Sequence, residues 1–216
     1  MAQRRETAGL VLGSVGLVLA AVTCGTPMWT EIVYIETCNW GGRPTTWEGL
    51  WMSCWVFKSI QNRCYPNKPE MMSQDMQAAR AMTSISIVSG VFGVVLSIIA
   101  KRCTKFFKED QSKSKASVVS GVFFILSGLL CCISVSWHAT TILTEPYELM
   151  SRFLKKSEMG AALYVGWAAT PLLLVGGGLL VWSCPPRHGF THVTSASTSR
   201  GPANGLPASE ETLSLT

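Results

Sequence analysis

Three cysteines lie in one segment of the sequence, close enough together for their thiols to react with one another. Cys54 and Cys64 lie ten positions apart, and Cys38 precedes them between the same two apolar runs. The chemistry available to them is oxidation to a disulfide, which persists outside the cell. We pair Cys54 with Cys64 because they flank a short segment that could form a hairpin, although spacing alone does not establish connectivity. Cys38 is then a free thiol, a competing partner or a link between two chains.

The patterns that enzymatic cysteine, histidine or serine chemistry requires do not occur in the sequence. It contains no CxxC pair, no HExxH motif and no recognisable Ser/His/Asp arrangement, so we do not expect an enzyme. His188 and His192 are four positions apart, but no third ligand accompanies them, and chance explains the pair better than a metal site. We expect no metal and no cofactor.

Composition places the chain in a membrane. Only 14% of its 216 residues are charged, whereas soluble domains have roughly 25%. Four runs of at least twenty residues contain no Asp, Glu, Lys or Arg: 8–28, 81–100, 116–137 and 160–182. A helix of about twenty residues covers about 30 Å, the hydrocarbon thickness of a bilayer, so the runs predict four transmembrane helices.

The distribution of positive charge predicts the orientation. Six of the eighteen basic residues lie in the short connection 101–115, which the positive-inside rule assigns to the cytoplasm. Loops 29–80 and 138–158 are then extracellular, and both termini are cytoplasmic. This clustering does not suit a nucleic-acid-binding face. A cleaved leader ending near Ala20 is the alternative for the first run, which is long for one.

The chain changes character after the fourth apolar run. Residues 185–216 are rich in Ser, Thr, Ala, Gly and Pro, so we predict a disordered tail after a membrane domain of residues 1–184. Cys103 and Cys184 lie at the predicted cytoplasmic ends of the second and fourth helices. Reversible palmitoylation is the candidate modification there, and a plain thiol is the equal alternative.

The long outer loop has the composition of a small sheet. Residues 30–36, 45–58 and 62–67 are rich in β-branched and aromatic side chains, and each stretch is expected to form one strand. From Glu70 the residues favour a short helix that leads into the second span. A sheet of this size needs a core, which the tryptophans of the loop could supply.

Five residues in and around this loop are candidates for structural roles: Trp29, Gly49, Leu50, Trp51 and Arg80. Gly49 indicates a bulge or a close approach of backbone. Leu50 and Trp51 point to opposite sides if the strand is regular. Arg80 opens the second span, and we favour a hydrogen bond from it to a backbone carbonyl over snorkelling to the interface.

These residues resemble a known family. Trp29, the Gly49-Leu50-Trp51 triplet and the pair Cys54 and Cys64 resemble the W…GLW…C…C pattern of the claudins. Two further stretches, 77–80 and 160–167, resemble the beginnings of the second and fourth helices in that family. The resemblance covers about residues 1–184.

The resemblance implies a fold and a role. The fold is a membrane α+β fold, in which a left-handed four-helix bundle carries a five-stranded antiparallel extracellular sheet. The role is that of a plasma-membrane protein of tight junctions, surrounded by membrane lipid, which binds itself and other claudin-like proteins in cis and trans. Strands of such proteins form a paracellular barrier or a paracellular ion channel.

The charges of the loop bear on what such a junction would pass. Lys58, Arg63 and Lys68 are basic, and residues 49–69 include no acid. Channel-forming claudins often carry a charged residue directly after the second cysteine, where this chain has Tyr65. We expect a plain barrier or an anion preference; that the charges only keep the loop soluble is the competing explanation.

Two stretches depart from the family pattern. The second outer loop reads Pro146-Tyr147-Glu148-Leu149 where claudins commonly have FYNP, so Tyr147 is the aromatic that remains for contact with the opposing cell. The chain given ends in Leu215-Thr216, and the polar last residue argues against binding to PDZ scaffold proteins.

An auxiliary four-transmembrane subunit of a receptor or calcium channel is the alternative function. Such relatives share the GLW triplet and the cysteine pair, but they commonly carry a glycosylation site in the first loop and a longer tail. The sequence has no Asn-x-Ser/Thr sequon. Tetraspanins are a poorer fit still, because they place a CCG motif in a large loop between the third and fourth spans.

Overall fold

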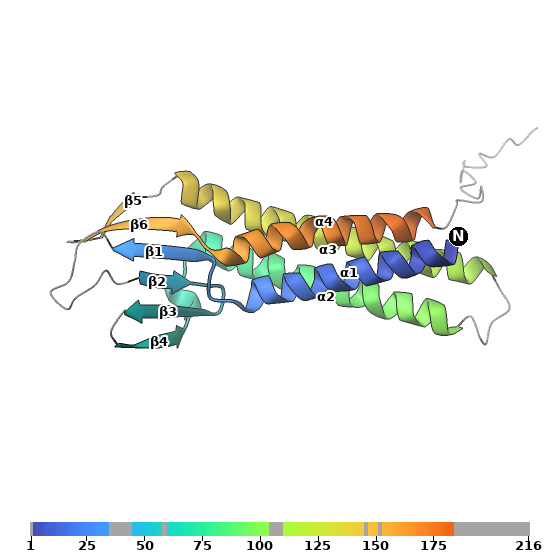
Figure 1. Ribbon diagram of the computed structural model, residues 1–216, viewed down its shortest axis with the longest axis horizontal. Helices are drawn as coiled ribbons and strands as arrows, with labels where there is room; N and C mark the ends of the chain where they lie inside the picture. The colour runs from blue at the N-terminus through green and yellow to red at the C-terminus, as the bar shows by residue number, and fades with distance from the viewer. Residues whose placement is uncertain are drawn as a thin grey trace, which may run out of the picture. The chain divides into compact units, whose positions relative to one another are not determined.

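The computed structural model shows a bundle of long helices with a β-sheet at one end (Figure 1). It describes residues 2–34, 45–57, 60–103, 110–144, 147–150 and 153–183. Within these ranges the four helices are α1 (Ala2–Gly25), α2 (Gln74–Cys103), α3 (Asp110–Thr144) and α4 (Ala161–Trp182). A single 3₁₀ turn, Pro69–Met71, precedes α2. The predicted tail lies outside the described residues.

All four helices are long and apolar enough to cross a membrane, as the apolar runs predicted. α1 ends three residues before the predicted boundary, at Gly25. The helix expected near Glu70 begins at Gln74 and is continuous with α2. α3 has 35 residues, which at about 1.5 Å per residue gives roughly 52 Å, so α3 is longer than a bilayer is thick.

Glycines allow the helices to approach closely. A Cβ on Gly176 would lie 2.6 Å from the backbone nitrogen of Gly13, and one on Gly177 would lie 2.6 Å from the carbonyl oxygen of Gly121. Two adjacent glycines of α4 therefore serve two different neighbours, α1 and α3. Lipid gives helices no hydrophobic reason to associate, so such close contact is a main source of bundle stability.

A seam of hydroxyl side chains joins α2 to α3. On α3 the buried members are Ser120, Ser127 and Ser134, which are spaced by seven residues, or about two helical turns. The central pair is reciprocal: the Ser86 hydroxyl donates to the Ser127 carbonyl at 2.7 Å, and the Ser127 hydroxyl donates to the Ser86 carbonyl at 2.8 Å. The seam satisfies polar groups that lipid cannot, and it fixes the register of the two helices.

The sheet contains six strands within the described residues. They are β1 (Thr30–Tyr34), β2 (Thr45–Glu48), β3 (Met52–Phe57), β4 (Ile60–Pro66), β5 (Tyr147–Met150) and β6 (Phe153–Met159). Their order is β4-β3-β2-β1-β6-β5, and every neighbouring pair is antiparallel. The two predicted outer loops thus form one sheet, joined where β1 pairs with β6 (Figure 1).

Two expectations about the strands were wrong. Residues 45–58 do not form one strand, because the chain reverses at Gly49-Leu50-Trp51 and makes the hairpin β2–β3. The sheet has six described strands and not five, because the second loop contributes both β5 and β6. The four-helix bundle with a small antiparallel sheet is otherwise the fold that was predicted.

Candidate functional site: the sheet and its junction with the bundle

Trp29, the residue before β1, connects three parts of the junction. Its side chain is fully buried, and its indole N–H donates to the carbonyl of Thr23 in α1 at 2.7 Å. Its backbone N–H donates to the Glu48 carbonyl at the end of β2, and its own carbonyl accepts from the N–H of Gly160, just before α4. One residue thereby sets the angle at which the sheet leaves the bundle.

His138 supports Trp29 from α3. Its ring is buried and meets the Trp29 ring edge-on, with the ring centroids 5.5 Å apart. Its Nε2 atom lies 2.9 Å from the hydroxyl oxygen of Thr30, the first residue of β1. This role of His138 was not predicted; its signal in the sequence is a single polar aromatic residue directly after the third apolar run.

Gly49 and Gly160 occupy positions that have no room for a side chain. A Cβ on Gly49 would lie 2.4 Å from the Cα of Pro27, and a Cβ on Gly160 would lie 2.0 Å from the carbonyl oxygen of Met28. Both neighbours are backbone atoms of the segment that links α1 to β1. The sequence prediction of a close backbone approach at Gly49 agrees with this geometry.

Leu50 inserts the β2–β3 turn into the end of the bundle. Its side chain is fully buried in a cluster that includes Trp29. The cluster also includes one residue from each of three helices: Ala79 of α2, Val135 of α3 and Leu163 of α4. Burying a leucine fully is worth roughly 2 kcal/mol. The turn is therefore an anchor, which explains why it is made of apolar residues.

Trp51 is 40% exposed, whereas Leu50 beside it is fully buried. Its indole N–H donates to the sulfur of Cys24 at 3.3 Å, and the Arg80 guanidinium carbon lies 3.7 Å from the centroid of its ring. Arg80 does tie the loop to α2, through this cation–π contact and not through the hydrogen bond to a carbonyl that we expected.

Asn67 closes the base of the β3–β4 hairpin. Its amide N–H donates to the Gly49 carbonyl at 2.7 Å, while its amide oxygen accepts from the Ser53 hydroxyl at 2.7 Å. Its backbone N–H donates to the Trp51 carbonyl at 2.9 Å. The side chain thus holds together the turn that anchors the sheet, a role that composition did not reveal.

Cys54 and Cys64 form a disulfide, as the sequence predicted. They lie directly opposite each other on β3 and β4, with their Cα atoms 4.0 Å apart. The bond closes a short ring that includes the β3–β4 turn, and such a ring restricts the unfolded chain by roughly 3 kcal/mol. Its position keeps β4 attached at the edge of the sheet.

The comparisons with known proteins agree with this arrangement. Residues 7–180 match the model of the PMP-22/EMP/MP20/Claudin family. The chain is 40% identical to Claudin-4 of Bos taurus over 196 residues, which are 90% of this chain and 93% of that protein. It is 38% identical to Claudin-3 of Mus musculus over 209 residues, or 95% of each chain. The chain belongs to the claudin family.

Membership in the family decides the general role. The claudin-like chain is a multi-pass membrane protein of tight junctions, where claudins interact with one another. It is a structural protein and not an enzyme.

Along one cross-strand row of the claudin-like sheet, the side chains change from buried to exposed. Ile32, Thr46, Trp55 and Arg63 follow one another on β1, β2, β3 and β4. The first two are buried, whereas Trp55 and Arg63 are exposed. Trp55 stacks on Tyr34 with the ring centroids 6.1 Å apart. The row therefore ends at β4 in an exposed aromatic and cationic surface.

Three of the four residues proposed for selectivity lie on or beside β4. Arg63, Tyr65 and Lys68 are exposed, and alternation along the strand puts Arg63 and Tyr65 on the face opposite Cys64. Lys58 lies outside the described residues. Tyr147 begins β5, at the other edge of the sheet from β4.

The remaining site residues of the claudin-like chain stay predictions. Cys103 is the last residue of α2, at the end away from the sheet, which suits palmitoylation but does not test it. Cys38, Cys184 and Leu215-Thr216 lie outside the described residues. Across the part of the chain that the structure describes, no three His, Cys, Asp or Glu side chains gather as a metal site would require.

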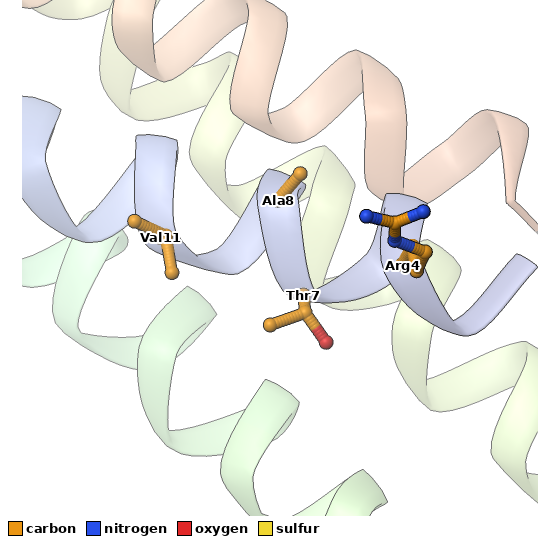
Figure 2. Close-up of a pocket in the computed structure, with 4 residues that line it drawn as sticks. All are labelled: Arg4, Thr7, Ala8 and Val11. Atoms are coloured by element: carbon orange, nitrogen blue, oxygen red, sulfur yellow. The ribbon is translucent and has the colours of Figure 1, made fainter.

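An open hollow lies on α1 at the end away from the sheet. It is lined by Arg4, Thr7, Ala8 and Val11, which follow the i, i+3, i+4, i+7 spacing of one helix face (Figure 2). The hollow is open to the outside of the bundle and encloses no buried polar group among its lining residues. It adds no evident chemistry to the junctional role.

Proposed function

We propose that the chain polymerises through its sheet into tight-junction strands that restrict paracellular passage and admit anions better than cations. The assembly part rests on the two edge strands, β4 and β5. An edge strand carries unpaired N–H and C=O groups, and these can pair with a strand of another copy. The disulfide stabilises β4, so that this edge is preformed for pairing.

The selectivity part rests on Arg63. It is exposed on β4, and no described residue forms an ion pair with it. Glu158 lies four strands away on β6 and pairs with Lys156 at 2.8 Å, and Glu48 on β2 has an interaction partner of its own. An uncompensated positive charge beside a pore raises the local concentration of anions and repels cations.

The orientation in this proposal puts the sheet outside the cell and both termini inside. It is supported by the basic residues Arg4, Arg5, Lys101 and Lys115, which lie at the ends of the helices away from the sheet. Epitope tags at either terminus should then be detected only after the cells are permeabilised.

The proposal is tested in two steps. The chain is first expressed in cells that lack tight junctions, and freeze-fracture should reveal strands at cell contacts. Uniform staining of the cell surface without strands would contradict assembly. In an epithelial layer, the dilution potential should then report a chloride preference.

The charge at β4 is tested by substitution. Arg63→Gln should reduce the chloride preference and Arg63→Glu should reverse it, while both variants still form strands. Lys115→Gln, an exposed lysine on α3 at the end away from the sheet, is the matched control and should change selectivity little. If the wild type raises resistance without any ion preference, the chain is a plain barrier and the anion part of the proposal is wrong.

A further inference from the structure

We propose that Arg80, held on the ring of Trp51, binds the phosphodiester group of a membrane phospholipid at the sheet end of the bundle. Arg80 is the last charged residue before the apolar run 81–100 of α2. Its side chain therefore lies at the boundary between the hydrocarbon layer and the headgroups. Phosphate groups are most concentrated at that depth.

The guanidinium group is held in place before any ligand arrives. Its central carbon lies 3.7 Å above the Trp51 ring, and that ring is itself fixed by the bond from its N–H to the Cys24 sulfur. An arginine that is already ordered loses less side-chain entropy on binding than a mobile one. The planar ring also orients the fork of donors, which suits two oxygens of one phosphate.

Most of the donors of Arg80 are unused. A guanidinium carries five N–H donors. Among the residues that the structure describes, its one polar side-chain contact runs from Nη1 to the sulfur of Met72 at 4.0 Å, and thioether sulfur is a weak acceptor. The nearest acid along the helix, Asp75, instead accepts the indole N–H of Trp137 at 3.3 Å. An oxyanion would be the first strong acceptor for this group.

The surroundings suit a lipid better than a free ion. Trp51 is 40% exposed where it carries the arginine, and Val88 and Val91 are exposed on the side of α2 that Arg80 shares. A phosphodiester at Arg80 would place its acyl chains along this apolar side of α2. Inorganic phosphate would gain nothing from these contacts.

The test uses the full-length protein in detergent and counts bound lipids by native mass spectrometry. Phosphatidylcholine is added stepwise, in parallel with diacylglycerol of the same acyl chains, which lacks the phosphodiester. The wild type should bind the first phosphatidylcholine about tenfold more tightly than diacylglycerol, because a charge-assisted bidentate hydrogen bond distinguishes the two. Equal binding of the two lipids by the wild type would overturn the proposal.

Substitutions locate the site. Arg80→Gln should remove the preference for phosphatidylcholine, and Arg80→Lys should reduce it less, because it keeps the charge and loses the fork. Arg4→Gln is the matched control, since Arg4 also lies at the end of an apolar run but beside an open hollow and not on an aromatic ring (Figure 2). An equal loss in the Arg4 variant would show generic charge attraction and refute a site at Arg80.

Folding is controlled by helix content and by the intact disulfide. If Arg80→Gln does not fold, the wild-type comparison of the two lipids and the Arg80→Lys variant still decide the outcome. Retention of the full preference in a folded Arg80→Lys and Arg80→Gln pair would overturn the proposal. Added inorganic phosphate should not compete at concentrations at which phosphatidylcholine binds; effective competition would identify a simple anion site.

Discussion

Single residues at the junction are constrained by space more than by conformation. Gly160 has an ordinary backbone, with φ of −79°, so no left-handed geometry requires a glycine there. What it lacks is room, because the carbonyl of Met28 occupies the place of a side chain. The segment that follows α1 can pass over the start of α4 only because of this.

Gly160→Ala should therefore destabilise the protein by about 3 kcal/mol, the upper end for overpacking, since the clashing neighbour is backbone and cannot rotate away. Thermal unfolding in detergent would measure the effect. Gly178→Ala is the control, because a Cβ there meets nothing within 4 Å and alanine favours a helix. If both variants unfold at the wild-type temperature, the tight packing at Gly160 is wrong.

Asn67 offers a second test at this scale. Asn67→Ala removes two side-chain hydrogen bonds that hold the β2–β3 turn, and should cost about 1–3 kcal/mol with the disulfide intact. Gln77→Ala also removes two hydrogen bonds, but they are exposed to solvent and should be worth less. The ratio of the two losses in thermal unfolding checks whether the turn is a structural anchor.

Among the elements, the helices followed from the sequence and the strands followed only in part. An apolar run of twenty residues has one stable structure in lipid, so its helix is local information. The reversal at Gly49-Leu50-Trp51 was missed because Leu50 and Trp51 are not typical of turns. Leu50 is apolar because the bundle buries it. β6 pairs with β1, more than a hundred residues away, and β5 pairs with β6 in turn. No local pattern encodes the long-range pairing.

The candidate site also has features that could be predicted from the sequence and features that could not. The disulfide and the Gly49 contact were predictable, because cysteine oxidation and missing side chains follow from residue type. The cation–π contact of Arg80 and the roles of His138 and Asn67 depend on which elements meet in space, so the sequence did not contain them in readable form.

The seam between α2 and α3 makes a prediction about elements. The hydroxyl oxygens of Ser86 and Ser127 also lie 3.2 Å apart. In a double-mutant cycle, Ser86→Ala and Ser127→Ala should therefore show a coupling of about 0.6 kcal/mol, the average for hydrogen bonds between membrane helices. Ser14→Ala is the control, because that hydroxyl bonds to Leu10 within its own helix. Additive effects of the two seam variants would mean that the two hydroxyl groups do not interact with each other.

For the molecule as a whole, removing the disulfide tests whether the sheet can lose its fold while the helix bundle keeps its own. Cys54→Ser with Cys64→Ser should cost roughly 3 kcal/mol by the chain-entropy argument. The helices are held by glycine contacts and the hydroxyl seam, so helix content by circular dichroism should remain while antibodies against the folded sheet lose binding. Loss of both signals together would show that sheet and bundle fold as one unit.

The continuity of the sheet across β1 and β6 has a consequence for chimeras between relatives. The register places Glu31 opposite Glu158, a pair of like charges that the neighbouring Lys156 offsets. A graft that exchanges only one of the two hairpin regions would separate residues that have to match across this line. Transplanted specificity should therefore require both regions together, and half-exchanged hybrids should be retained inside the cell.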